Sequence, residues 1–376
     1  MLLTGVQAQY ADHIIPGAAQ TSRYLPLLKN KRVALLVNQT AMIDRTHLVD
    51  SLLKLNVRIQ KIFSPEHGFR GNADAGEKVG NSTDPKTGLP IISLYGKHRK
   101  ATAADLQDVD ILIFDIQDVG TRFYTYISSL QELMESAAAS NKTLLILDRP
   151  NPNGDYVDGP VLDTAYRSFV GMQPIPIVHG MTVAEYARML NGERWLSKGV
   201  QCNIKYIPCE NYSHKVYYRL PVKPSPNLPN MAAIHLYPSL CFFEGTAVSL
   251  GRGTDKPFQV FGAPGFPKNG YSFTPRSTAG AKDPVLKDQL CYGFDLSNTP
   301  EAAPGKDRQI VLRWLIEAYH LYPEKDKFFN PFFNKLAGNA TLMQQIKTGV
   351  SESDIRKSWE PGLAKFKVIR AKYLLY

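Results

Sequence analysis

The chain has 376 residues, of which 44% are hydrophobic and 21% are charged, a composition that excludes a largely disordered protein. A chain of this length is expected to hold two domains, because a single core seldom grows past about 250–300 residues. The formal net charge of +10 favours anionic partners, but the basic residues are scattered and form no nucleic-acid-binding motif, so we expect an acidic small ligand or an anionic cell wall and no nucleic acid.

The chain begins with an apolar stretch followed by small residues around Ala8, a pattern that resembles the end of a signal peptide. We therefore expect an exported protein, periplasmic or extracellular. No later apolar run is long enough to cross a bilayer, so no transmembrane segment is expected. The cysteines have neither metal-ligand spacing nor a dense disulfide framework, although one bridge is possible. The four cysteines are Cys202, Cys209, Cys241 and Cys291.

Apolar, β-branched runs alternate with helical patterns in the first part of the chain. Strands separated by helices pair in parallel, so this alternation predicts an α/β sheet. Helices are expected at residues 44–55 and in the stretch that ends at residue 130. Strands are expected at residues 31–39, 57–63 and 91–95, from residue 111, and at 143–147.

Beyond about residue 160 this alternation stops. Thr182 and Glu185 have the spacing of a capping box, which opens a helix that ends near Asn191. The segments that follow are rich in proline, glycine and aromatic residues, and this composition predicts a second α+β domain. We therefore divide the chain into an α/β domain at residues 10–160 and an α+β domain at residues 161–376. Within the second domain, the irregular segments are 221–230 and 237–258, and further helices are expected near 308–320 and 351–357.

Polar residues follow four of the expected strands, at or just beyond their carboxyl ends. Ligands of open α/β sheets bind in the crevice outside these ends, so the four polar segments should meet at one rim of the sheet. No glycine-rich dinucleotide fingerprint or phosphate loop accompanies the first strand, so we expect no nucleotide and no other cofactor. The four segments are residues 38–40, 64–67, 115–122 and 148–151.

Three carboxylates are candidates for chemistry, two in the rim segments and one in the second domain. Glu66 follows a buried strand and precedes a glycine-containing turn, which suits acid–base catalysis; the alternative is a salt bridge to Arg70. Glu244 stands between a phenylalanine and a glycine, where an apolar wall can raise its pKa or where it can be a structural carboxylate. Asp118 lies in a strand-to-helix turn, where it or Thr121 is expected to cap the following helix.

Other side chains, in the polar segments and elsewhere in the chain, are candidates for substrate binding, each with an ordinary structural alternative. Tyr124 can wall a sugar site, yet at helical spacing it can also face the core. His67 can assist proton transfer or be a plain hydrogen-bonded histidine. No spacing among His67, Asp115 and Asp118 is diagnostic of a metal site, so no metal is predicted. Three arginines beside turn residues can clamp a carboxylate or pair with neighbouring aspartates, namely Arg122, Arg149 and Arg252.

Taken together, eight motifs resemble those of one family, the NamZ-type exo-β-N-acetylmuramidases, which are glycoside hydrolases long catalogued as a bacterial domain of unknown function. The resemblance runs from about Arg32 to about Pro264, and more loosely to the C-terminus. The motifs are Asn38-Gln39-Thr40, SPEHGFRG from Ser64, FDIQDVGTRFYTYISSL from Phe114, LDRPNP from Leu147, DGP from Asp158, SPNLPN from Ser225, YPSLCFFEGT from Tyr237 and GRGT from Gly251.

This resemblance implies a Rossmann-like N-terminal domain, a smaller C-terminal domain and an active-site cleft between them. It also implies release of N-acetylmuramic acid from the non-reducing end of peptide-free peptidoglycan fragments such as MurNAc-GlcNAc. The family's catalytic glutamate corresponds to Glu66, and Glu244 or Asp118 is our candidate for a second carboxylate. An arginine can hold the lactyl carboxylate of muramic acid. Substrate contacts are expected from His67, Arg70, Asp115, Arg122, Tyr124, Arg149, Asn151, Asn227 and Arg252.

Two other functions stay open at this point. A binding protein that captures muropeptides without cleaving them would need the same polar rim and the same arginines. A hydrolase of peptide or ester bonds is less well supported, because the sequence has no nucleophile-elbow serine and no papain-like cysteine signature. The oligomeric state and the stereochemical outcome of hydrolysis do not follow from the sequence.

Overall fold

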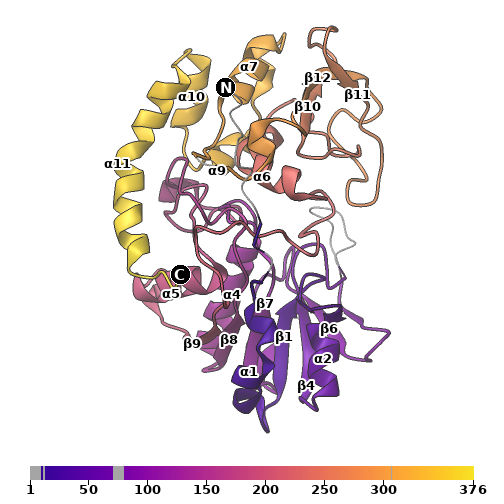
Figure 1. Cartoon of the computed structure of the whole chain (residues 1–376), viewed down its shortest axis with the longest axis vertical. Coiled ribbons are helices and arrows are strands. Elements are labelled where there is room, and N and C mark those ends of the chain that lie inside the picture. Colours follow the sequence, from indigo (N-terminus) through magenta and orange to yellow (C-terminus); the bar gives the residue numbers. More distant parts are fainter. Residues whose placement is uncertain (1–9, 12, 71–79, 306) are drawn as a thin grey trace, which may run out of the picture.

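The structure is a computed structural model and describes residues 10–11, 13–70, 80–305 and 307–376. The signal-peptide-like start lies outside the described residues, as does Gly71, the last residue of the motif that begins at Ser64. Figure 1 shows a sheet half, formed by the described residues of 10–230, below a second half, formed by those of 231–376. The two halves are stacked along the long axis of the molecule.

A seven-stranded sheet is the framework of the sheet half (Figure 1). Its order is β5-β6-β4-β1-β7-β8-β9, in which β5 pairs antiparallel with β6 and every other pair is parallel. This confirms the predicted α/β fold. The strands are β1 (Val33–Val37), β4 (Ile59–Ser64), β5 (Ser82–Thr83), β6 (Pro90–Ser93), β7 (Ile111–Asp115), β8 (Thr143–Leu147) and β9 (Asn203–Ile207), and a separate hairpin joins β2 (Met42–Ile43) to β3 (Thr46–His47).

The sheet is covered by helices on both faces, as its apolar sequence requires. Successive side chains of a strand point to opposite faces. In β1, therefore, Leu35 packs in one hydrophobic core, while Leu36 packs in the other. Helices α1 (Thr21–Leu28) and α2 (Leu48–Lys54) contribute to the first core, and α4 (Tyr126–Ala139) and α5 (Val183–Gly192) are among the helices that contribute to the second. The short α3 (Ala103–Leu106) precedes β7.

The second half combines a small antiparallel sheet, of order β10-β12-β11, with helices. Its core is continuous with that of the sheet half, because the Phe123 ring lies 5.3 Å from the ring of Tyr237 and 6.2 Å from that of Phe242. The expected smaller α+β part is confirmed. Its elements are α6 (Met231–Leu240), β10 (Val260–Ala263), β11 (Tyr271–Phe273), β12 (Cys291–Asp295), α7 (Arg313–Leu321), α8 (Lys325–Phe328), α9 (Phe333–Ala337), α10 (Thr341–Lys347) and α11 (Glu352–Ala371).

Some predicted boundaries differ from the structure for identifiable reasons. Helix α2 begins at Leu48 and not at Asp44, because the β2–β3 hairpin occupies the residues before it. Helix α11 continues to Ala371, through the Pro361-Gly362 pair that normally marks a break. Strand β9 joins the parallel sheet although it comes after residue 160. It is an edge strand in which exposed and partly buried residues alternate, so it lacks the continuous apolar run of its neighbours.

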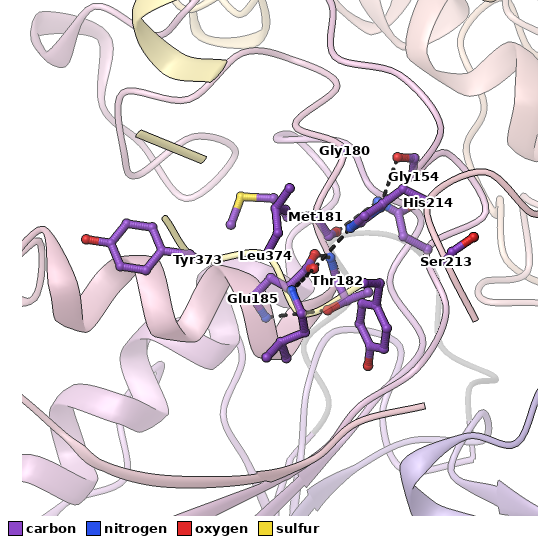
Figure 2. Close-up of polar contacts among 12 residues, drawn as sticks. Gly154, Gly180, Met181, Thr182, Glu185, Ser213, His214, Tyr373 and Leu374 are labelled. Carbon is purple, nitrogen blue, oxygen red and sulfur yellow. Dashed lines mark hydrogen bonds and ion pairs between the residues drawn. The ribbon is translucent and has the colours of Figure 1, made fainter. Parts of the chain in front are cut away.

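The C-terminus returns to the sheet half and is held there by α5. Helix α11 runs along one side of the molecule and ends beside α5 (Figure 1). Figure 2 shows Glu185 at the centre of these contacts, between Thr182 and His214. The Glu185 carboxylate accepts hydrogen bonds from the backbone of Thr182 at 2.8 Å, from the backbone of Leu375 at 2.7 Å and from His214 Nε2 at 3.0 Å. The predicted capping box of Thr182 and Glu185 is present, and all four cysteines are free.

Candidate active site

A cavity of about 550 Å³ lies between the two halves and is lined by residues of both. We call it the rim cavity, because its lower wall comes from the segments that follow the carboxyl ends of β4, β6 and β7. This is the crevice in which open α/β sheets bind their ligands. Six of the predicted site residues line the cavity, namely Glu66, His67, Tyr124, Asn227, Glu244 and Arg252.

Glu66 is held at the cavity wall by a tight turn and two hydroxyl groups. The turn begins where β4 ends: the Gly68 amide donates to the Pro65 carbonyl at 3.0 Å, and His67 and Gly68 both have left-handed backbone conformations. The Tyr95 hydroxyl donates to Glu66 Oε1 and the Thr125 hydroxyl to Oε2, each at 2.8 Å. Because each of the two oxygens accepts a hydrogen bond, the orientation of the Glu66 carboxyl group is fixed.

Arg70, the alternative partner of Glu66, is engaged elsewhere. Its guanidinium pairs with Asp84 at 2.7 Å and stacks over the Phe69 ring at 4.3 Å. Arg70 does not line the rim cavity, so the expectation that it contacts the substrate does not fit this site.

Tyr95 keeps its proton and is therefore a hydrogen-bond donor to Glu66. Burial, followed by the nearby Glu66 charge, raises the pKa of Tyr95 above its ordinary value. Hydrogen bonds to a charged group are worth about 1.5–3 kcal/mol, so Tyr95→Phe should lower kcat about ten- to hundred-fold if Glu66 acts in the reaction. The control is Tyr271→Phe, at an exposed tyrosine of β11. An unchanged kcat for Tyr95→Phe would show that this hydrogen bond does not matter for turnover.

Glu244 faces the rim cavity from the second half, at the end of a 3-10 helix (Cys241–Gly245). It forms an ion pair with Arg252, whose Nε lies 3.0 Å from Glu244 Oε1, and the Arg252 guanidinium stacks over the Phe258 ring at 4.9 Å. Three quarters of the Glu244 side chain is buried and its carboxylate is ion-paired, so the structural interpretation of Glu244 stays open beside the catalytic one. The pair presents one negative and one positive group to the same cavity.

Arg122 is not a substrate-binding residue in this structure. Its side chain is completely buried and donates to four backbone carbonyls, those of Pro160, Ile175, Leu336 and Ala337, at 2.8–3.0 Å. Burial lowers the pKa of Arg122 to about 9. The arginine therefore joins the sheet half to α9 of the second half, and its role is structural.

Asp115 and Arg149 are both buried and do not line the rim cavity. They pair with each other in full burial, at 2.5 Å from Arg149 Nε to Asp115 Oδ1 and 2.9 Å from Nη2 to Oδ2. Asn151 is buried as well, and its Nδ2 donates to the Met181 carbonyl at 2.8 Å. A buried charge needs a partner, and each of these groups has found one within the protein. The expectation of direct substrate contacts from these three residues is therefore corrected.

Asp118 lies beneath the cavity wall, where burial raises the pKa of its carboxyl to about 7. Its Oδ1 accepts a hydrogen bond from the Gly120 amide at 2.6 Å. It does not line the rim cavity, so the structure favours Glu244 over Asp118 as the second carboxylate. Neither Asp118 nor Thr121 caps α4: the N-cap residue of this helix is Thr125, which makes no side-chain capping bond because its hydroxyl donates to Glu66.

The cavity also contains polar residues that the sequence did not predict, among them Tyr95, Arg99, Thr125 and Lys335. Tyr95 is the last residue of an expected strand, and Thr125 lies in the motif that begins at Phe114. The positions of both in the sequence could therefore have marked them as site residues. Lys335 lies in an ordinary helix, and nothing in the sequence around it indicated a site residue. Within the described part of the chain, no group of three histidine, cysteine or acidic residues could hold a metal ion. No helix among the described residues has the length and apolar character needed to cross a membrane.

Comparison with known proteins identifies the family of this site. The family model described as exo-beta-N-acetylmuramidase NamZ, N-terminal, matches residues 33–232, and the corresponding C-terminal model matches residues 235–376. The chain belongs to the NamZ family. It is therefore a glycosidase. The C-terminal NamZ model begins within α6 and covers the rest of the second half, so the rim cavity is lined by residues from both NamZ domains.

Similar proteins cover nearly the whole chain. The peptidoglycan beta-N-acetylmuramidase NamZ of Bacillus subtilis (strain 168) is 38% identical over 94% of this chain and 89% of its own length. A crystal structure of a DUF1343 family protein from Bacteroides fragilis has a TM-score of 0.89 at 51% identity and covers 97% of this chain and 99% of its own. A second DUF1343 protein of that organism has a TM-score of 0.83 at 29% identity, covering 96% and 99%.

Proposed function

We propose that this NamZ-family glycosidase acts on peptidoglycan and releases N-acetylmuramic acid from the non-reducing end of its fragments. The observation that carries the proposal is the position of Glu66, held by Tyr95 and Thr125 at the wall of a sugar-sized cavity with Glu244 also in the lining. The similarity to the Bacillus subtilis enzyme supports the substrate class. We likewise propose that the enzyme works outside the cytoplasm, where peptidoglycan is found.

Two carboxylates are the usual requirement of glycoside hydrolysis, and two of the described residues that line the rim cavity, Glu66 and Glu244, carry one. In our proposal Glu66 is the general acid that donates a proton to the leaving-group oxygen of the scissile bond, and Tyr95 and Thr125 hold its carboxyl group in place. Glu244 is tied to Arg252, which keeps its charge in place for stabilising the positive charge that develops on the sugar ring. Attack by the substrate's own 2-acetamido group is the known alternative to a protein nucleophile.

The direct test is hydrolysis of a chromogenic β-N-acetylmuraminide, with the matching β-N-acetylglucosaminide as the comparison substrate. We expect release of the chromophore from the muraminide. An exo-acting enzyme cleaves at the chain end. With an oligomeric peptide-free glycan as substrate, free N-acetylmuramic acid should therefore appear in the first turnovers of the enzyme. Release of internal fragments without the free sugar would contradict exo-action while leaving the glycosidase assignment intact.

The stereochemical outcome gives a further prediction. We expect retention of configuration, by a protein nucleophile or by the 2-acetamido group, so the first-formed product of a β-linked substrate should be β-N-acetylmuramic acid. Proton NMR within the first minutes of reaction, before mutarotation, distinguishes the anomers. Initial formation of the α anomer would exclude retention by either route and would indicate an inverting mechanism with room for a water molecule.

A further inference from the structure

Two cations of the rim cavity have no acidic partner among the described residues. Arg99 lies beyond β6 in the sheet half, and Lys335 lies on α9 in the second half; both line the cavity. The residues beside Arg99 are paired, His98 with Asp105 at 3.3 Å and Lys100 with Glu132 at 3.0 Å. Arg252, the third cation of the cavity, is paired with Glu244. Among the described residues of the cavity, Arg99 and Lys335 are therefore the available positive charges.

Arg99 is supported in a defined position despite its exposure. Its Nε donates to the Gly96 carbonyl at 3.1 Å, and its guanidinium lies 4.4 Å over the Phe169 ring. The Phe169 loop is fixed in turn, because the Ser128 hydroxyl donates to the Phe169 carbonyl at 2.7 Å. The Phe169 ring lies 6.4 Å from the ring of Tyr95, which holds Glu66. No described partner occupies the two terminal nitrogens of Arg99, which can bind one carboxylate in bidentate fashion.

Lys335 reaches the cavity from the opposite half, on a helix that is itself held in place. The fully buried Arg122 donates to the carbonyls of Leu336 and Ala337, the two residues that follow Lys335 in α9. This contact ties the helix that carries Lys335 to the sheet half. Lysine and arginine from the two halves thus line one cavity that also contains the carboxylates of Glu66 and Glu244. A substrate anion would meet repulsion from these carboxylates unless cations compensated for them.

We propose that Arg99 and Lys335 together form a carboxylate clamp that binds the lactyl group of the muramic acid residue and so selects muraminides over glucosaminides. This inference rests on the proposed function. It replaces the expectation that Arg70, Arg122, Arg149 or Arg252 makes this contact. The first three arginines are engaged away from the cavity, and Arg252 is paired with Glu244. Glucosaminides lack the lactyl group, and esterification removes its charge with little change in shape, so two different substrate changes probe the same clamp.

The test combines enzyme and substrate variants. Arg99→Gln and Lys335→Met should each lower kcat/KM for the free-acid muraminide about ten- to hundred-fold. The same variants should change kcat/KM for the glucosaminide, or for the lactyl methyl ester, by less than about threefold, because these substrates never used the clamp. Arg99→Lys and Lys335→Arg should recover part of the loss. Arg23→Gln and Lys357→Gln, at exposed positions outside the cavity, are the matched controls.

Calorimetric binding of N-acetylmuramic acid and of its methyl ester gives a readout that does not need turnover. The wild-type protein should bind the free acid more tightly, and Arg99→Gln and Lys335→Met should abolish this preference. If the wild type hydrolyses muraminides and both variants keep the full preference for the free acid, the clamp is overturned and the proposed function stands. If the wild type neither cleaves muraminides nor binds the free acid, the proposed function and the clamp fall together.

Discussion

Glu66→Gln should lower kcat by about 10²–10⁴-fold, the range typical of general acid–base catalysis, while the protein stays folded. Glutamine matches glutamate in shape and can still hydrogen-bond with Tyr95 and Thr125, whose hydroxyls donate to the native carboxylate. What the substitution removes is the ionisable group. Steady-state rates on a chromogenic muraminide, measured beside thermal unfolding of the same preparation, separate loss of chemistry from loss of structure.

The matched control for this prediction is Glu210→Gln. Glu210 is half exposed and pairs with Arg23 outside the rim cavity. The Glu210→Gln variant should therefore have the same kcat as the wild type. A decrease of less than tenfold for Glu66→Gln would remove Glu66 as the acid–base residue. The remaining carboxylate of the cavity, Glu244, would then be the candidate to test by the same substitution.

Arg122→Met should destabilise the protein by about 3–5 kcal/mol, the cost of leaving buried polar groups without their charged partner. Four carbonyls, those of Pro160, Ile175, Leu336 and Ala337, accept hydrogen bonds from this one side chain. Methionine replaces the unbranched stem of arginine but is shorter than arginine and donates no hydrogen bond. Urea unfolding followed by circular dichroism measures the loss.

Arg276→Met provides the comparison, because the Arg276 side chain is 71% exposed and its ion pair with Asp288 is 3.7 Å long. Exposed pairs of this kind contribute about 0–1 kcal/mol, so the midpoint of unfolding should hardly move. A loss of less than about 1 kcal/mol for Arg122→Met would mean that water or a shifted backbone satisfies the four carbonyls. Because Arg122 anchors α9, its loss should also displace Lys335 from the cavity.

The sequence by itself determined the parallel sheet and the place of the site on it. Continuous apolar runs specify buried strands, and the carboxyl ends of parallel strands necessarily meet at one edge, so the chain order alone puts Glu66 and His67 at that edge. The capping box at Thr182 was equally local, because its two hydrogen bonds join residues three apart. These features depend on neighbours in the chain, which a sequence displays directly.

Only the tertiary structure decided which charges at the rim face the cavity. Charged residues at or just after the ends of strands are typical of a binding site, and Asp115, Arg122 and Arg149 occupy such positions. Each of them, however, is bonded to other groups of the protein. The reason is that burying a charge requires a partner, and the partner is supplied by packing. For Arg122 that partner is the backbone of α9, more than 200 residues away in sequence. The same packing brings Lys335, which no local pattern marks, into the cavity that Glu66 and Tyr95 also line.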